Sequence, residues 1–477
     1  SRKSKHQKLY SKYNIPHIGQ ASFIYSVAGL YENIADYCLG KSNAHGELMA
    51  LAAYGKSIHE QAFYDPGLLV TVNSNNEVIF RNDWQHKVPV KPDFAQQAVL
   101  AWRCQEATEA ALLAYAKIAK SLTGSNNLCV AGGVFLNILG NTAIASSGIF
   151  ENFFVPSAPH DGGIAIGCAF HGARLLGETC QKVTTDRLGP YQSNASCLAS
   201  LKAKQSFIHW RSISDEQVID AISQGKIVAR YKERSEFGPR ALGARSLLAT
   251  PLNENIKIRL NKIKGRQKWR PIAPVIPANE FDRFFEGPKD SQWMTQSQKI
   301  HSEFRESLPV LRHPDNSTRA QTLHKNCDPQ LFSWLTTIGD QTGFPILANT
   351  SFNRHGEPII ESPQEALNMF LCCSDIDLLL LGPFIVERRN LINSLQANDL
   401  RLSSKVFLTT MFRGSKQYFN ISNGLLTWSL TNDLYETLQK LGLVNMSASK
   451  VFSLHSSNPK SLSIITQLLI NEVITIL

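Results

Sequence analysis

The sequence predicts an α/β protein with more than one domain. The order of buried strand, Gly-Gly turn and helix occurs twice, at residues 128–133 and at 153–163, and this order is typical of α/β folds. With 477 residues, 43% of them hydrophobic and 18% charged, the chain can fill two or three cores. The same composition excludes disordered, collagen-like and coiled-coil proteins.

The elements of the first domain follow from caps and apolar runs. Asp93 is a suitable N-cap and Gly124 a suitable C′ residue, and the stretch between them has no Gly or Pro. It predicts one long helix or two abutting helices. Strands are expected at 128–131 and 153–155, and the apolar run 164–176 predicts a helix. We expect this first domain to comprise residues 1–180.

A linker is expected at 181–205, because residues 178–205 lose apolar periodicity and gain Ser, Thr and Gly. The second domain then begins with a strand at 207–210. Ser214, with Gln217 at the capping-box position, predicts the start of a helix that ends at Gly225.

A strand at 226–231 and a helix from Pro363 continue the second α/β domain, which we place at residues 206–390. Residues 391–477 form a C-terminal extension without motifs. One docking helix is predicted there from helical spacing of five apolar residues: Leu462, Ile465, Leu469, Val473 and Ile476.

The net charge of +10, at a sequence pI near 9.1, is local. Residues 226–270 contain thirteen Lys or Arg and three acidic residues, whereas the remainder holds 36 of each sign. A long polyanion would meet basic side chains over a wider footprint, so nucleic acid is not the expected partner.

The cysteines and the apolar runs indicate in which cellular compartment the protein is expected. The nine cysteines show no C-x-x-C spacing, which argues against a disulfide framework or zinc ribbon. No leader-like apolar segment and no run of bilayer length are visible. We expect a cytoplasmic protein without a membrane partner.

The first motif is residues 236–246 (EFGPRALGARS), preceded by Arg230 and Arg234. Glycines allow close backbone approach and guanidinium groups offer two parallel donors, so Arg240 and its neighbours suit a phosphate or carboxylate. A solvated basic loop is the alternative.

The second motif is residues 264–274 (KGRQKWRPIAP). Lys264 and Arg270 are six residues apart, and prolines stiffen the segment that follows. These features suit a polyphosphate or carbonyl-phosphate ligand. A nucleic-acid patch is the alternative, because Trp269 could stack on a base.

Two further motifs carry weaker signals. Residues 347–353 (LANTSFN) place Asn349 and Ser351 at the end of an apolar run, where α/β folds bind ligands, although a capped turn explains them equally well. The Gly132-Gly133 turn with Asn137 could admit a nucleotide. Asp161, before the second Gly-Gly pair, could bind a metal or position a nucleotide, or be a turn residue.

Taken in order from residue 49 (MALAAYG) to about residue 383, these motifs resemble the ATP-dependent O-carbamoyltransferases of natural-product biosynthesis, which act on nodulation factors, cephamycin, tobramycin and saxitoxin-type precursors. The resemblance implies part of an actin-like ATPase-fold domain followed by a YrdC-like α/β domain. The YrdC-like domain would make carbamoyl-adenylate from carbamoyl phosphate and ATP, and the other would pass the carbamoyl group to a hydroxyl of a small-molecule acceptor.

The resemblance also implies roles for particular residues. Lys264, Arg270, Arg319 and Ser351 would hold carbamoyl phosphate and the nucleotide phosphates, with help from Arg240 and Asn349. Gly132, Gly133 and Asn137 would contact nucleotide, and Asp161 would be one ligand of a divalent metal, Fe or Mg. A homodimer is compatible with this family.

Two departures from the family pattern stand out. No two of the thirteen histidines are four residues apart, so the family's His-x-x-x-His metal pair is missing, and we expect a fragment or a divergent member. Glu47 stands where the pattern predicts a Lys. The rival interpretations are a tRNA threonylcarbamoyl-type or hydrogenase-maturation carbamoyltransferase, and a non-catalytic nucleotide- or nucleic-acid-binding protein.

Overall fold

The computed structural model describes residues 26–389, apart from 41–43, 59–63, 66, 90, 181–184 and 355, and short stretches between 399 and 476. The chain forms two compact units that are not continuous in sequence. The first contains residues 1–186, 237–240 and 269–347, and the second contains 187–236, 241–268 and 348–477. The compact units thus differ from the sequential domains 1–180 and 206–390, because residues 269–347 pack with the N-terminal part.

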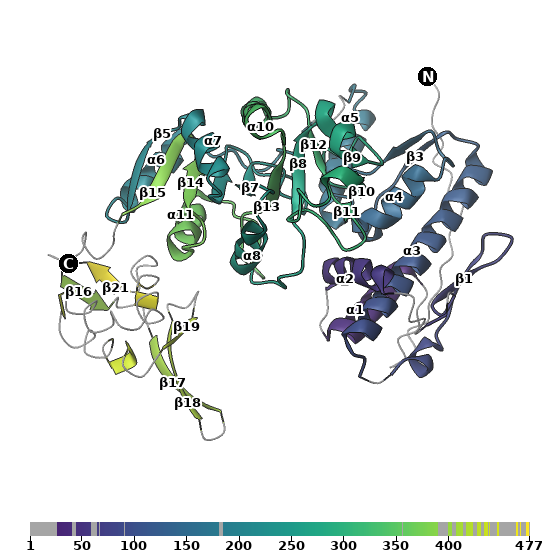
Figure 1. Ribbon diagram of the computed structural model, residues 1–477, viewed down its shortest axis with the longest axis horizontal. Helices are drawn as coiled ribbons and strands as arrows, with labels where there is room; N and C mark the ends of the chain where they lie inside the picture. Colours follow the sequence, from purple (N-terminus) through teal and green to yellow (C-terminus); the bar gives the residue numbers. More distant parts are fainter. Residues whose placement is uncertain are drawn as a thin grey trace. The chain divides into compact units, whose positions relative to one another are not determined.

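Three helices form the main apolar core of the first unit, and Figure 1 shows them side by side. Gly55 of the second helix lies against the backbone of the third, where an added Cβ would be 1.9 Å from the Ala98 carbonyl oxygen. Buried residues such as Leu30, Leu48 and Trp84 fill the space between the helices. The elements of this part are α1 (Val27–Leu39), α2 (His45–Ser57), β1 (Val70–Val72), β2 (Val78–Phe80) and α3 (Phe94–Thr123).

A strand–turn–helix layer continues the first unit. Two short strands pair in parallel, and each leads to a Gly-Gly turn. Its elements are β3 (Asn127–Cys129), α4 (Ile138–Ser146), β4 (Asn152–Phe154) and α5 (Ile164–Leu175). Residues 269–347 add β8 (Ala273–Pro277), α9 (Phe281–Phe284), β9 (Phe285–Glu286), β10 (Gln298–Ile300), β11 (Ser317–Thr318), β12 (Gln321–Leu323) and α10 (Pro329–Thr342).

The second unit is built on a mixed sheet with the strand order β13-β7-β6-β14-β15-β5. The pairs are antiparallel except for β6 and β14, which run parallel. The three strands β7, β6 and β14 are buried along their whole length, and β14 is apolar throughout, as expected of a strand that is covered on both faces. Its elements are α6 (Asn194–Ala203), β5 (Ile208–Ser212), α7 (Asp215–Ser223), β6 (Val228–Tyr231), β7 (Arg245–Ala249), α8 (Glu254–Ile263), β13 (Leu347–Ser351), α11 (Pro363–Cys372), β14 (Leu378–Leu381) and β15 (Phe384–Arg388).

Further strands are described in the C-terminal extension. Three of them form an antiparallel meander and three others form a second small sheet. They are β16 (Asp399–Leu402), β17 (Phe407–Arg413), β18 (Lys416–Ser422), β19 (Thr427–Leu430), β20 (Met446–Ser447) and β21 (Ile474–Ile476).

The long helix between Asp93 and Gly124 is confirmed as one helix, α3. The Asp93 side chain accepts a hydrogen bond from the Gln96 backbone N–H at 2.8 Å, and the Gln96 side-chain oxygen accepts one from the Asp93 backbone N–H at 3.1 Å. Gly124 ends the helix in the left-handed region, at φ 63°. The strands, the helix from Ile164 and the helix from Pro363 are likewise present.

Three expectations need correction. The linker 181–205 contains α6, whose buried Cys197 and Leu201 lie on a helix capped by Ser193 and packed against α11. Gln217 does not complete a capping box, because its side-chain oxygen accepts a hydrogen bond from Arg211. A docking helix reaching Ile476 is wrong at its end, since Ile476 pairs with Leu400 in a sheet; Leu462, Leu469 and Val473 lie outside the described residues.

Within the described part of the chain, no helix combines the length and the apolar content that crossing a bilayer requires.

Candidate functional site

Lys264 and Ser351, both predicted site residues, meet in the second unit. The buried Lys264 follows the last turn of α8, and its Nζ lies 2.8 Å from Ser351 Oγ and 2.9 Å from the Ser351 carbonyl oxygen. It also lies 2.9 Å from the Asn353 carbonyl oxygen and contacts Asn353 Oδ1. The structure therefore joins the second and third sequence motifs through one ammonium group.

Asn349 links the third motif to the first. It lies on β13, which pairs antiparallel with β7, and its buried side-chain amide donates to the Ala241 carbonyl oxygen at 3.1 Å. The residues of the NTSFN segment therefore hold both the ammonium of Lys264 and the loop that precedes β7.

Glu236 organises that loop. Its carboxylate accepts hydrogen bonds from the backbone N–H groups of Leu242 and Ala244, both at 2.7 Å, and from that of Arg245 at 3.2 Å. A carboxylate that accepts several backbone donors fixes a loop strongly. Glu236 thus shapes the first motif.

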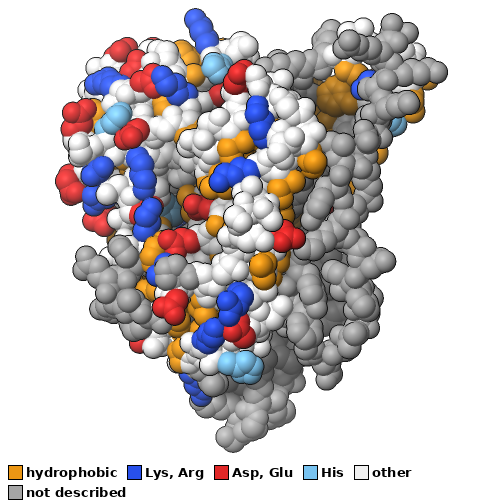
Figure 2. All heavy atoms as spheres, turned by 90° about the vertical axis from the view of Figure 1, so that its right-hand side faces the viewer, with side chains coloured by type: hydrophobic (Ala, Val, Ile, Leu, Met, Phe, Trp, Pro, Cys, Tyr) orange, Lys and Arg blue, Asp and Glu red, His pale blue; other side chains and the backbone are white. Residues whose placement is uncertain are grey.

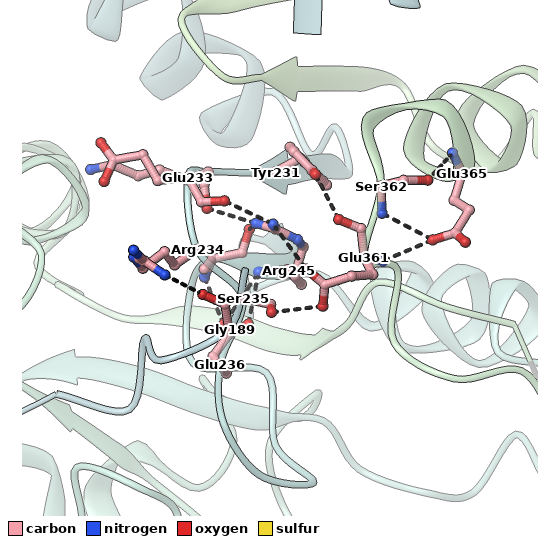
Figure 3. Close-up of polar contacts among 12 residues, drawn as sticks. Gly189, Tyr231, Glu233, Arg234, Ser235, Glu236, Arg245, Glu361, Ser362 and Glu365 are labelled. Atoms are coloured by element: carbon pink, nitrogen blue, oxygen red, sulfur yellow. Dashed lines mark hydrogen bonds and ion pairs between the residues drawn. The ribbon is translucent and has the colours of Figure 1, made fainter. Parts of the chain in front are cut away.

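Arg245 makes several contacts next to this loop, and Figure 3 shows them. The guanidinium group lies 3.6 Å from the centre of the Tyr231 ring and donates to the carbonyl oxygens of Lys232 and Glu233, at 2.6 and 3.0 Å. Glu361 lies 4.0 Å away and accepts from the Ser235 hydroxyl at 2.7 Å. Burial lowers the pKa of Arg245.

Arg240 and Arg270 come together in the first unit. Burial, and then the neighbouring charge of Arg270, lower the pKa of Arg240 to about 10. Burial also lowers the pKa of Arg270, and the carboxylate of Glu47, 3.9 Å away, opposes this shift. Two desolvated cations beside one carboxylate carry a net positive charge that an anion can offset. We call Glu47, Arg240 and Arg270 the arginine cluster.

Arg319 lies between β11 and β12 in the same unit and is half-buried. The turn before it is tight: Asn316 has φ 62°, and the Asp315 carboxylate accepts from both the N–H and the hydroxyl of Ser317. The place of Arg319 in the site stays a prediction.

The two Gly-Gly turns lie side by side, because the Gly132 N–H donates to the Pro159 carbonyl oxygen at 2.6 Å. Parallel pairing of β3 with β4 brings both turns to one edge. Gly132, Gly133 and Asp161 are exposed there. Asn137 instead is buried, caps α4 through the Gly140 N–H and exchanges hydrogen bonds with Gln105. Its predicted contact with nucleotide is untested.

Among the described residues, no three His, Cys, Asp or Glu side chains gather where they could hold a metal ion. Asp161 is therefore a single carboxylate in this part of the chain, and a divalent metal on it stays a prediction.

Comparison with known proteins agrees with this arrangement of motifs. The Carbamoyltransferase N-terminus family matches residues 3–170, and the Carbamoyltransferase C-terminus family matches residues 219–388. The two matches together cover most of the 477 residues. The chain belongs to the carbamoyltransferase family.

Similar curated proteins of this family are nodulation proteins. The chain is 33% identical over 310 residues to Nodulation protein NolNO of Sinorhizobium fredii. This aligned region covers 62% of the chain and 45% of NolNO. It is 33% identical over 294 residues to Nodulation protein NolO of Bradyrhizobium diazoefficiens, covering 60% and 54%. The chain thus spans about half the length of the curated relatives it matches. A crystal structure of full-length HypF in the phosphate- and nucleotide-bound form also matches, at 15% sequence identity. The match covers 53% of this chain and 34% of the HypF chain, with a TM-score of 0.25.

The structure shows contacts of three side chains that the sequence motifs do not predict. Asn353 binds Lys264, and its place within the NTSFN segment could have indicated this. Glu47 pairs with Arg270, and Tyr54 Oη donates to the Trp269 carbonyl oxygen at 3.3 Å. More than 200 residues separate these last partners, so no local pattern reveals them.

Proposed function

We propose that this protein is an ATP-dependent O-carbamoyltransferase, which activates a carbamoyl group with ATP and transfers it to a hydroxyl of a small natural product. The supporting observation is the buried ammonium of Lys264 held by Ser351 and Asn353, in a chain of the carbamoyltransferase family. An ammonium group is a compact positive charge that binds phosphate oxygens, so such a site suits a phosphate-bearing ligand.

The proposed chemistry needs two anions in contact. Carbamoyl phosphate loses phosphate to water and yields carbamate, whose oxygen attacks the α-phosphorus of ATP. A new phosphorus–oxygen bond forms, pyrophosphate leaves, and the product is carbamoyl-adenylate. The acceptor hydroxyl then attacks the carbamoyl carbon, loses its proton and releases AMP. In this proposal Lys264, Arg270, Arg319 and Ser351 offset the repulsion between the two anions and position them.

The same proposal assigns a fold to each part of the chain. Residues 1–180 would be part of an actin-like ATPase-fold domain, and the YrdC-like domain would lie within 206–390. ATP would contact the backbone at the exposed Gly132-Gly133 turn, and Asp161 would lie nearby in the adjacent Gly-Gly turn. Asp161 would supply one carboxylate to a divalent metal, and that metal would offset negative charge on the phosphates.

The first prediction tests this function directly. The purified protein, given carbamoyl phosphate and ATP, is expected to release pyrophosphate, and Arg270→Ala should abolish the release because the variant removes one of two desolvated cations. A coupled pyrophosphate assay measures both. Arg211→Ala is the control, since Arg211 forms an exposed pair with Glu387. Equal release by wild type and Arg270→Ala would contradict the assignment of the site.

A further inference from the structure

Glu47 is the negative member of the arginine cluster. Its Oε1 lies 3.9 Å from Arg270 Nη1, and the side chains of Glu47 and Arg270 are only 11% and 21% exposed. Charges that are this far withdrawn from water interact more strongly than an exposed pair. Glu47 therefore reduces the electrostatic attraction between Arg270 and an anionic ligand.

Two contacts hold Glu47 in place. Gly55, on the same helix α2, packs so closely on α3 that no Cβ fits beside Ala98. Tyr54, one residue earlier, donates to the Trp269 carbonyl oxygen and packs edge-on against the Trp269 ring, with centroids 5.0 Å apart. Helix α2 thus contacts residues 269 and 270 at two points, so Glu47 is a fixed neighbour of Arg270.

The charge of the cluster follows from its members. Arg240 and Arg270 contribute two positive charges in partly desolvated positions, and burial, followed by the charge of Arg270, lowers the pKa of Arg240. Glu47 reduces the sum to +1. A lysine at position 47, as the family pattern predicts, would raise it to +3. The residue at position 47 therefore sets the charge of the cluster between +1 and +3, one unit to either side of the +2 that a neutral glutamine would give.

We infer that Glu47 is a specificity-determining residue, which lowers the affinity of the arginine cluster for anions and does so most for anions of high charge. The inference rests on the proposed function, because it takes the cluster as the site of a phosphate-bearing ligand. Coulomb energy grows with the charge of the ligand, so Glu47 repels pyrophosphate more than it repels inorganic phosphate. The chain then favours a small anion of low charge at Arg270.

Titration calorimetry of the full chain with inorganic phosphate and with pyrophosphate tests this role. Glu47→Gln keeps the shape of the side chain and removes its charge. We expect it to tighten phosphate binding about tenfold, equal to about 1.4 kcal/mol, and pyrophosphate binding by a larger factor. Glu47→Asp retains the charge and is expected to keep the wild-type ratio of the two affinities.

Two controls make the result specific. In the Arg270→Ala background, Glu47→Gln should no longer change either affinity by the full factor, because its partner is gone. Glu106→Gln removes an exposed carboxylate of α3 that pairs with Arg103 at 2.7 Å, and it should change neither affinity. If Glu106→Gln changed the two affinities as much as Glu47→Gln does, the net charge of the protein would explain the change in anion affinity. That result would overturn the inference.

The outcomes separate this inference from the proposed function. If Arg270→Ala loses phosphate binding while Glu47→Gln binds both anions as wild type does, the role of Glu47 is wrong and the proposed function stands. An equal tightening for both anions would likewise overturn the selectivity. If no form of the protein binds either anion, both proposals fail.

Discussion

Arg245 illustrates how a motif arginine can serve the fold. It is fully buried, stacks on Tyr231 and donates to two carbonyl oxygens of the segment before the loop. Arg230 and Arg234 also donate to carbonyl oxygens, those of Gly243 and Gly189. Within the first motif, Arg240 is the residue that we propose for an anion site, because burial and the charge of Arg270 both lower its pKa.

Replacing Arg245 by methionine is expected to lower the free energy of unfolding by about 3 kcal/mol. The change removes the ring contact and a buried charge, and it leaves the carbonyl oxygens of Lys232 and Glu233 without this donor. Chemical denaturation measures the loss. Arg211→Met, at an exposed ion pair, should cost less than about 1 kcal/mol. Equal losses for the two variants would show that Arg245 does not stabilise the loop.

Helix α2 couples the core of the first unit to the arginine cluster, and this coupling depends on Gly55. An alanine Cβ there would lie 1.9 Å from the Ala98 carbonyl oxygen and 2.9 Å from Trp102 Cβ. Neither backbone nor a Cβ can yield easily, so α2 and α3 would have to separate.

Gly55→Ala is therefore expected to destabilise the protein by about 1–3 kcal/mol. It should also tighten phosphate binding, because α2 carries Glu47, whose charge opposes anion binding, to Arg270. Gly46→Ala is the matched control on the same helix, where an added Cβ meets nothing within 4 Å. It should be neutral or stabilising by up to about 1 kcal/mol. Thermal melts that rank the two variants the other way would contradict the close packing of α2 on α3.

Elements whose signals are local could be predicted, and contacts between distant segments could not. The ends of α3 follow from Asp93 and Gly124 because each cap acts within one turn. Helix α6 was missed because its buried face has only Cys197 and Leu201, too few for a visible period. The grouping of Lys264 with Ser351 follows from matching motifs to a family, whereas the pairing of Glu47 with Arg270 depends on the tertiary fold alone.

For the molecule as a whole, part of the charge of the basic segment 226–270 is offset by acidic residues from elsewhere in the chain. Arg259 pairs with Asp377 at 2.6 Å, Lys262 with Asp375 at 2.8 Å and Arg270 with Glu47 at 3.9 Å, and all three acids lie outside the segment. On the face that Figure 2 shows, basic and acidic side chains are interspersed. The net charge of +10 thus does not require a basic surface of the extent that a nucleic-acid strand needs.

This distribution of charge predicts how binding depends on salt. A single bound ATP would contact few cations, so its affinity should fall only modestly between 50 and 200 mM salt. A nucleic-acid strand with six or more phosphates neutralised by the protein would lose about a thousandfold in affinity. Fluorescence anisotropy with a labelled ATP analogue and with a labelled single-stranded RNA measures both. We expect binding of the nucleotide with a shallow slope and weak binding of the RNA. Tight RNA binding with a steep slope would favour a nucleic-acid-binding protein, since only a surface that displaces many counterions gives that dependence.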